Sequence, residues 1–102
     1  MANKLQIETI VKSLKEYIPE IKDQYKIQQL GIFGSYVRGE ETENSDIDIL
    51  VEFTSNLDFG LLTFCQLENK LSEKLGAKVD LVIKDNLKPR LRQNILNEVI
   101  YL

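Results

Sequence analysis

Three aspartates set within apolar runs are the residues of this chain best suited to chemistry. Asp46 and Asp48 open the run Ile47–Phe53, and Asp80 interrupts the shorter run Val79–Ile83. Aspartate is disfavoured in strands and a buried, unpaired carboxylate is costly, so we expect something to compensate. Because side chains alternate along a strand, Asp46 and Asp48 point to the same side with α-carbons roughly 6.6 Å apart. Two carboxylates at this spacing can converge on one hard cation, and Asp80 adds a ligand if its strand lies alongside.

A plainer interpretation of these aspartates stays open on pattern alone. In it, Asp46 caps a turn after Asn44 and Ser45, while Asp48 and Asp80 lie at solvated strand ends. The cation proposed in the first interpretation is Mg²⁺, which prefers oxygen ligands, few of them protein carboxylates, and substrate phosphates for the rest.

A glycine-containing turn follows the first strand pattern. Residues 34–39 read Gly-Ser-Tyr-Val-Arg-Gly, and Gly34 lets the backbone approach a ligand closely because it has no Cβ. Ser35 is predicted at the N-cap of a short helix, where its hydroxyl and the backbone N–H groups suit phosphate oxygens, and Arg38 adds a cation. A simple strand-to-helix turn with a capping serine is the alternative, because the segment lacks the Walker pattern.

The rest of the chain alternates patterns typical of helices and strands. Apolar spacing predicts a first amphipathic helix, bent or stopped at Pro19, and a second long helix that ends at Gly76. A final helix opens at Pro89, and 36–38 form one helical turn. The apolar positions are Ile7, Ile10, Val11, Leu14, Ile18 and Ile21 in the first helix, Leu61, Phe64, Cys65, Leu67, Leu71 and Leu75 in the second, and Leu91, Ile95, Leu96, Val99, Ile100 and Leu102 in the last. The strands are Ile27–Phe33, Ile47–Phe53 and Val79–Ile83.

These elements predict an α+β fold, an α/β two-layer arrangement with a small mixed β-sheet and flanking helices. The run Ile47–Phe53 is apolar on both faces apart from Asp48 and Glu52, which predicts a central strand covered by helices on at least one side. The first two strands could pair in either direction. With 102 residues, the chain is expected to form one domain, 1–102.

Composition excludes several classes of function. The 13 basic and 16 acidic residues give a net charge of −3, which argues against a protein held to nucleic acid by bulk positive charge. The absence of histidine excludes Ser-His-Asp catalysis and imidazole metal sites. The one cysteine, Cys65, excludes an internal disulfide and a cysteine zinc cluster, and we expect it to pack in the core. With no apolar stretch long enough to span a bilayer, we expect no membrane association. The lone cysteine is compatible with a reducing cytoplasm, where we expect the protein to be located.

The aspartates and the glycine-containing turn together are more specific than either alone. Gly34-Ser35, Arg38-Gly39, the run Ser45-Asp46-Ile47-Asp48 and the pair Val79-Asp80 resemble the DNA polymerase β-like nucleotidyltransferase superfamily. Most closely, they resemble the minimal nucleotidyltransferase (MNT) antitoxins of HEPN-type toxins. In motif the resemblance runs from about residue 32 to 82, and in element order it covers nearly the whole chain. Val37 stands where family members often have alanine.

The resemblance implies a polymerase β-like nucleotidyltransferase fold and a role for each motif residue. Asp46, Asp48 and Asp80 would be the catalytic and metal-binding residues, while Gly34 and Ser35 would hold the nucleotide's phosphates. A phosphate contact of Arg38 is our own inference from its position. The implied function is transfer of AMP from ATP, with two Mg²⁺ ions, to a tyrosine of a HEPN-type RNase toxin. The partner would be the toxin, in a hetero-oligomer, and no direct binding of nucleic acid is expected.

Two other functions remain open from the sequence. The acceptor can be a small-molecule hydroxyl, as in aminoglycoside nucleotidyltransferases, although we find no further substrate-binding domain in 102 residues. Alternatively, the chain can be a non-catalytic antitoxin that neutralises its partner by occlusion.

Overall fold

The computed structural model describes residues 6–54 and 60–102 of the chain. Within these ranges the elements are α1 (Ile7–Ile21), β1 (Ile27–Phe33), α2 (Ser35–Arg38), β2 (Ile47–Phe53), α3 (Leu61–Leu75), β3 (Val79–Ile83), the 3₁₀ turn η1 (Lys84–Asn86), α4 (Pro89–Glu98) and β4 (Ile100–Tyr101). None of the described helices is long and apolar enough to cross a membrane.

The four strands form one mixed sheet in the order β3-β2-β1-β4. β1 pairs antiparallel with β2 and with β4, whereas β2 and β3 run parallel. The prediction of a mixed sheet with flanking helices is therefore confirmed, with β2 in an interior position. The pairing direction that the sequence left open is antiparallel.

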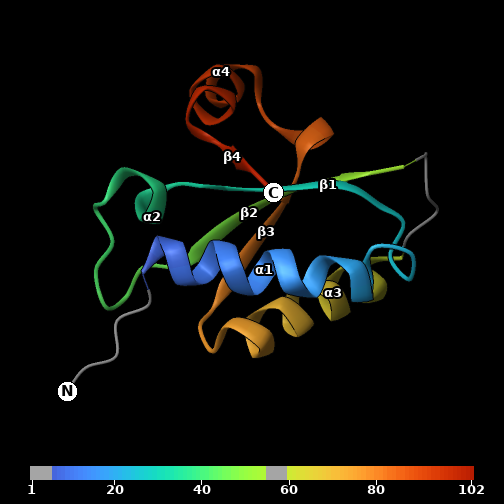
Figure 1. Cartoon of the computed structure of the whole chain (residues 1–102). Coiled ribbons are helices and arrows are strands. Elements are labelled where there is room, and N and C mark those ends of the chain that lie inside the picture. The colour runs from blue at the N-terminus through green and yellow to red at the C-terminus, as the bar shows by residue number, and fades with distance from the viewer. Residues whose placement is uncertain (1–5, 55–59) are drawn as a thin grey trace.

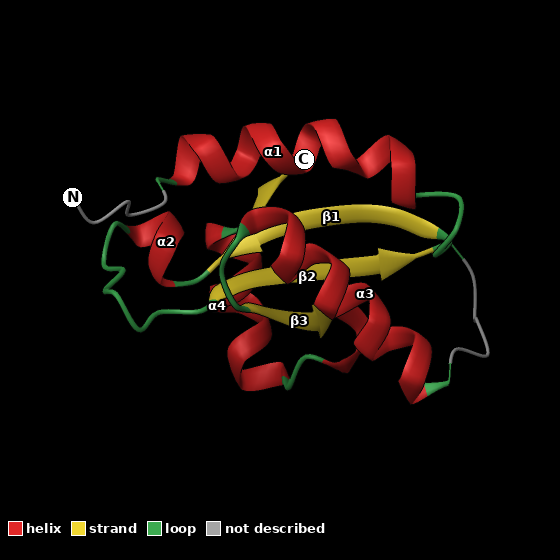
Figure 2. Ribbon diagram, turned by 90° about the horizontal axis from the view of Figure 1, so that it is seen from below, coloured by secondary structure: helices red, strands yellow, loops and turns green. Residues whose placement is uncertain are grey.

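The helices cover the sheet unequally. α1 and α3 lie side by side on one face, and α4 lies on the other (Figures 1 and 2). The core is the layer beneath α1 and α3, and each fully buried leucine or isoleucine there contributes about 1.5–3 kcal/mol relative to an exposed one. Its fully or nearly fully buried members include Ile10 and Leu14 of α1, Leu67 and Leu71 of α3, Leu30 and Ile32 of β1, and Ile47, Ile49 and Val51 of β2.

Alternation along β2 places the aspartates on the face opposite this core. Ile47, Ile49 and Val51 belong to the core cluster, so Asp48, which alternates with them, projects toward the face that carries α4. None of the residues of α4 is fully buried. The sheet thus separates an apolar face, which stabilises the fold, from a more open face with polar side chains.

Side chains of α3 satisfy the outer edge of β3. The N–H of Val79 donates to the Ser72 hydroxyl at 3.0 Å, and the N–H of Leu81 donates to a Glu68 carboxylate oxygen at 2.9 Å. An open strand edge exposes unpaired donors, so these two contacts close an edge that would otherwise attract another strand.

The end of the last helix differs from the prediction. The helix that begins at Pro89 ends at Glu98, because Val99 is extended (φ −62°, ψ 138°) and the next two residues form β4. β-Branched and aromatic residues favour strands, and here they find a partner in β1, where Gly31 pairs with Tyr101. A Cβ at Gly31 would overlap the Val99 side chain, so the glycine makes room for this close approach.

Two details of the long helices also differ. Cys65, expected in the core, is exposed. The buried stripe of α3 is Leu67, Leu71 and Leu75, and at 100° per residue Cys65 lies well off that stripe. In α1, Pro19 does not stop the helix, which continues to Ile21.

Candidate active site

The three predicted carboxylates lie on neighbouring strands. In the register of the sheet, Asp48 stands between Phe33 of β1 and Asp80 of β3. Asp46 lies just before β2, two residues before Asp48 and therefore on the same side of the strand. Asp46 and Asp48 are partly buried and Asp80 is exposed. The sequence alone could not show whether the strand of Asp80 lies beside that of Asp48. The parallel pairing of β2 with β3 shows that it does.

The electrostatics of Asp48 show that these carboxylates act on one another. Burial, the largest cause, together with the negative charges of Asp80 and Asp46 raises the pKa of Asp48 from 3.8 to about 6. The Arg38 cation opposes this rise. A divalent cation among these oxygens would remove the repulsion and favour the ionised form of Asp48.

The residues fit Mg²⁺ in their chemistry. All three side chains offer oxygen donors, and Mg²⁺ typically takes few protein carboxylates and keeps water or substrate phosphate for its other positions. Among residues 6–54 and 60–102, no three acidic side chains are already gathered around a single metal position. Within the described part of the chain, Asp46 forms a 3.9 Å pair with an exposed Lys78, and a solvent-accessible pair of this length holds its carboxylate weakly in place. Metal binding by these aspartates stays a prediction.

Gly34 directly follows β1, beside the acidic cluster, and a glycine is required there for two reasons. Its φ of +87° is a conformation that side chains other than glycine rarely adopt. A Cβ built at Gly34 would also overlap the carboxylate of Asp48. The glycine-containing turn and the acidic cluster are therefore one continuous site.

Ser35 does not occupy the predicted N-cap. Gly34 is the N-cap of α2, Ser35 is its first helical residue, and no side chain makes a capping hydrogen bond there. The carbonyl of Ser35 instead accepts the N–H of Glu40 at 2.9 Å and so closes the helical turn. The predicted contacts of Gly34, Ser35 and Arg38 with phosphate are not tested by this geometry.

Glu98 is a residue of this site that the sequence analysis missed. The N–H of Gly34 donates to Glu98 Oε2 at 2.6 Å, and Arg38 Nη1 donates to Glu98 Oε1 and Oε2 at 3.0 and 3.1 Å. Arg38 Nε also donates to Glu40 Oε1 at 2.8 Å. These bonds raise the pKa of Arg38 further, the Glu40 bond more than the Glu98 bond.

The sequence analysis placed Glu98 inside the last helix, so its position at a helix end is visible only in the structure. An acidic residue at the end of a helix is disfavoured by the helix dipole, so its presence there asks for a nearby cation. Its partners lie 60 and 64 residues away along the chain, and local sequence patterns do not predict contacts between segments so far apart.

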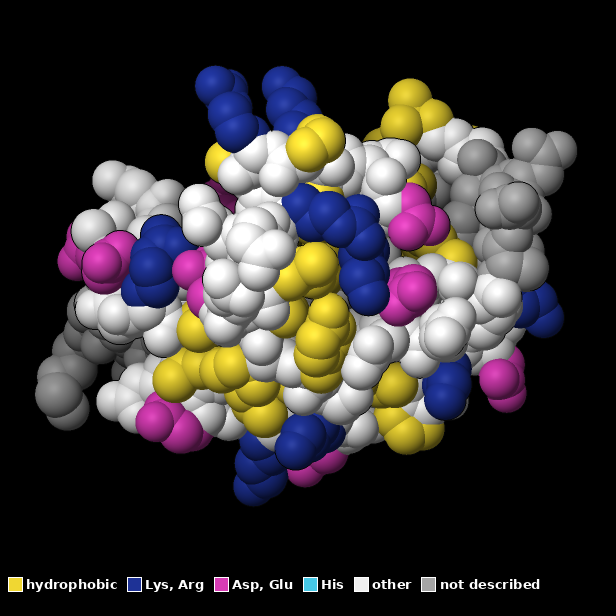
Figure 3. All heavy atoms as spheres, turned by 90° about the horizontal axis from the view of Figure 1, so that it is seen from above, with side chains coloured by type: hydrophobic (Ala, Val, Ile, Leu, Met, Phe, Trp, Pro, Cys, Tyr) yellow, Lys and Arg dark blue, Asp and Glu magenta, His cyan; other side chains and the backbone are white. Residues whose placement is uncertain are grey.

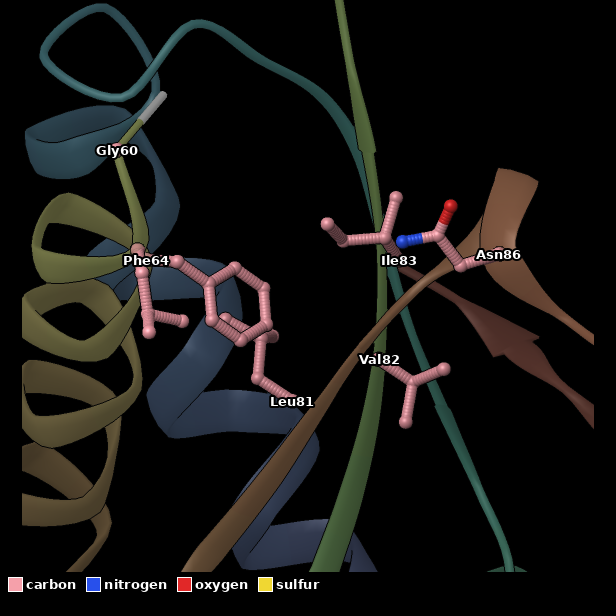
Figure 4. A pocket seen from close by; sticks show the side chains of 7 residues that line it. Gly60, Phe64, Leu81, Val82, Ile83 and Asn86 are labelled. Carbon is pink, nitrogen blue, oxygen red and sulfur yellow. The ribbon is translucent and has the colours of Figure 1, made fainter. Parts of the chain in front are cut away.

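The described surface over α4 and β4 mixes charges of both signs with exposed apolar side chains (Figure 3). A separate pocket of about 530 Å³ lies between the start of α3 and the end of β3 (Figure 4). None of its described lining residues belongs to the acidic cluster or carries a charge that could hold a phosphate, so we do not expect the chemistry there. Its lining is Gly60, Leu61, Phe64, Leu81, Val82, Ile83 and Asn86.

Residues 14–102 match the family model described as a nucleotidyltransferase domain. The chain is also 42 % identical over 98 residues to the protein adenylyltransferase MntA of Thermococcus cleftensis, which covers 96 % of this chain and 97 % of the relative.

Solved structures with the same fold belong to similar proteins. A chain described as a candidate minimal nucleotidyltransferase superposes with a TM-score of 0.78 at 34 % identity, covering 99 % of this chain and 100 % of that one. A toxin–antitoxin structure with AMP-PNP gives 0.66 at 33 % identity, covering 95 % and 72 %. The tri-AMPylated HEPN toxin of Shewanella oneidensis in complex with its MNT antitoxin gives 0.57 at 30 % identity, covering 92 % and 66 %.

Proposed function

This chain belongs to the nucleotidyltransferase domain family and is a nucleotidyltransferase; from that premise we propose that it is an antitoxin that transfers AMP from ATP to a HEPN-type toxin. The acceptor we propose is a tyrosine hydroxyl of the toxin, whose RNase activity is thereby neutralised. The observation that carries the proposal is the continuity of Asp46, Asp48 and Asp80 with the Gly34 turn. Similar proteins are named as a protein adenylyltransferase and as the MNT partner of an AMPylated toxin.

In the proposed reaction the acceptor oxygen attacks the α-phosphorus of ATP. A new oxygen–phosphorus bond forms, the bond to the β-phosphate oxygen breaks, and pyrophosphate leaves. Two anionic partners have to meet, so bound Mg²⁺, one ion or two, would neutralise triphosphate charge and lower the pKa of the acceptor hydroxyl. Catalysis of this kind depends mostly on positioning and electrostatics.

Each residue of the chain has a separate task in this scheme. Asp46 and Asp48 would hold the metal. Asp80, exposed on the neighbouring strand, would accept the proton of the attacking hydroxyl at its carboxylate. Gly34, Ser35 and Arg38 would bind phosphate oxygens, with the Arg38 guanidinium as the cation.

The proposal is tested with the purified chain, Mg²⁺ and a HEPN-type toxin, using ATP labelled at either the α- or the γ-phosphate. We expect label on the toxin from α-labelled ATP alone, because AMP and not phosphate is transferred. Asp46→Asn and Asp48→Asn should abolish labelling and leave the fold intact. Asp85→Asn, which removes an equal charge from the exposed turn η1, serves as the matched control.

Other outcomes would redirect the assignment. Full labelling by Asp46→Asn or Asp48→Asn would exclude the metal site. Label in the small-molecule fraction of a host lysate would indicate a small acceptor. Neutralisation of the toxin by Asp48→Asn without labelling would indicate an antitoxin that acts by binding alone.

A further inference from the structure

We propose that Glu98 is a positioning residue that orients Arg38 for the phosphates of the nucleotide. The inference deepens the proposed function and rests on it, since it assumes that Arg38 contacts ATP. Glu98 lies outside the acidic motif of β2 and β3, at the end of α4.

The geometry joins one carboxylate to two of the three groups predicted to bind phosphate. Both oxygens of Glu98 accept hydrogen bonds from Arg38 Nη1, and Oε2 also accepts the N–H of Gly34. The carboxylate therefore fixes the guanidinium relative to the backbone of the turn. Since the turn abuts Asp48, the cation is placed at a defined position beside the acidic cluster.

Glu98 is itself held firmly, which distinguishes it from the second partner of Arg38. Its side chain is 21 % exposed, against 64 % for Glu40. The backbone at Glu98 is anchored, because Glu98 is the last residue of α4 and is followed by β4, which pairs Ile100 with Ile32 of β1. Glu40 lies in an exposed loop after α2.

The hydrogen bonds of Arg38 to described residues leave part of the guanidinium available to a substrate. They use Nε, which donates to Glu40, and Nη1, which donates to Glu98. In this scheme the third guanidinium nitrogen, Nη2, donates to a phosphate oxygen of the nucleotide. A long side chain held in one orientation before binding loses less freedom when the ligand arrives, so its contact with phosphate is stronger.

The Glu98 carboxylate could have the opposite effect, which is to compete with ATP. The experiment distinguishes this effect from positioning. Glu98 adds negative charge near Asp48, and a carboxylate that occupies the place of a phosphate would compete with ATP. Removing the charge would then tighten ATP binding, whereas loss of a positioning residue weakens it.

The test compares Glu98→Gln, Arg38→Ala, the double variant and Glu40→Gln in the labelling assay. Glutamine keeps an oxygen that can accept the Gly34 N–H but loses the ion pair with Arg38. We expect Glu98→Gln to raise KM for ATP about tenfold with kcat changed less than about threefold, the pattern of lost substrate binding. Arg38→Ala should mask the effect, so that the double variant matches Arg38→Ala. Glu40→Gln, a matched loss of charge beside the same guanidinium, should change KM less.

Thermal melting and direct titration of Mg-ATP accompany the kinetics. A merely structural role would lower the melting temperature and the active fraction without raising KM, and would overturn the inference. So would an unchanged or lowered KM in Glu98→Gln while the wild type transfers AMP normally. If Glu98→Gln is poorly folded, Glu98→Asp is measured instead; it keeps the charge on a shorter side chain, and the same rise in KM is expected. A wild type that binds ATP but transfers nothing refutes the proposed function, and weakened ATP binding by Glu98→Gln then still supports positioning.

Discussion

Asp48 occupies a place where a carboxylate is costly for the fold and useful for binding a cation. It is partly buried on a central strand, and the burial together with Asp80 and Asp46 raises its pKa to about 6. A bound divalent cation would relieve the same crowding that disfavours its charge, and we therefore predict Mg²⁺ binding at this position.

We expect the stability of the metal-free protein to fall as pH rises from about 4 to about 6 and then to level off. The folded state holds the proton of Asp48 more tightly than the unfolded state, so this contribution is complete below pH 3.8 and is lost as pH rises through about 6. We expect a loss of about 1–2 kcal/mol, less than for a fully buried carboxylate, because solvent screens the partly exposed group. Urea unfolding in EDTA across this range checks it.

Asp48→Asn is the control for this pH dependence. The variant should lose the slope between pH 4 and 6 and be the more stable protein at pH 7. A wild type and a variant with parallel pH profiles would show that Asp48 does not titrate in this window.

At the scale of elements, the close contact between β1 and β4 joins the end of α4 to the site. Gly31 faces Val99, and its missing side chain lets β4 approach β1 closely enough to pair. The N–H of Leu102 extends the contact by donating to the carbonyl of Leu30 at 3.0 Å. The position of Glu98 therefore depends on a glycine three residues before the Gly34 turn.

Gly31→Val should destabilise the protein by about 1–3 kcal/mol, since a side chain there would overlap Val99 and force β4 away. Val99→Ala in the same chain should recover part of this loss by making room. Chemical unfolding of the two single variants and the double variant measures the coupling. Strictly additive effects would contradict the contact.

The sequence predicted those elements whose patterns lie within a few neighbouring residues, and failed where a distant segment decided the structure. The bounds of β1, β2 and β3 followed from apolar runs, and Gly76 marked the end of α3, because each signal lies within a few residues. The last residues were wrongly assigned to a helix. Val99 and Ile100 suit a helix face or a strand, and the choice was made by the distant partner strand β1.

The candidate site followed the same rule. The types of Asp46, Asp48 and Asp80 suggested a cation site, but only the parallel register of β2 and β3 brings Asp80 beside Asp48. Ser35 was predicted at the N-cap of α2, but the N-cap is the preceding residue, Gly34. The N-cap position has a φ of +87°, which glycine adopts readily and serine does not. Glu98 could not be found from pattern, since its partner Arg38 is 60 residues away.

At the scale of the whole molecule, the sheet separates the apolar core on one face from the candidate site on the other. The core lies beneath α1 and α3, and the aspartates lie on the other face, where α4 has no fully buried residue. Charges gathered on that face cost the fold some stability, and the core on the opposite face offsets it. A ligand that neutralises these charges should therefore stabilise the protein as a whole.

We expect saturating Mg²⁺ to raise the melting temperature and EDTA to reverse the rise. An ion at 100 times its dissociation constant stabilises the folded state by about 2.7 kcal/mol, provided that it does not bind the unfolded chain. Differential scanning calorimetry with wild type, Asp48→Asn and the control Asp85→Asn measures the shift. Equal shifts in all three proteins would show that the ion binds elsewhere.

The pairing of β4 with β1 also orders events during synthesis. A ribosome makes β1, Arg38 and all three aspartates before it makes Glu98, so a nascent chain carries the aspartates while the guanidinium still lacks its anchor. Contacts between such distant segments form slowly, because a long loop has to close first. On the proposed role of Arg38, an emerging chain acquires its capacity to hold nucleotide late, after β4 has joined the sheet and Glu98 has reached Arg38.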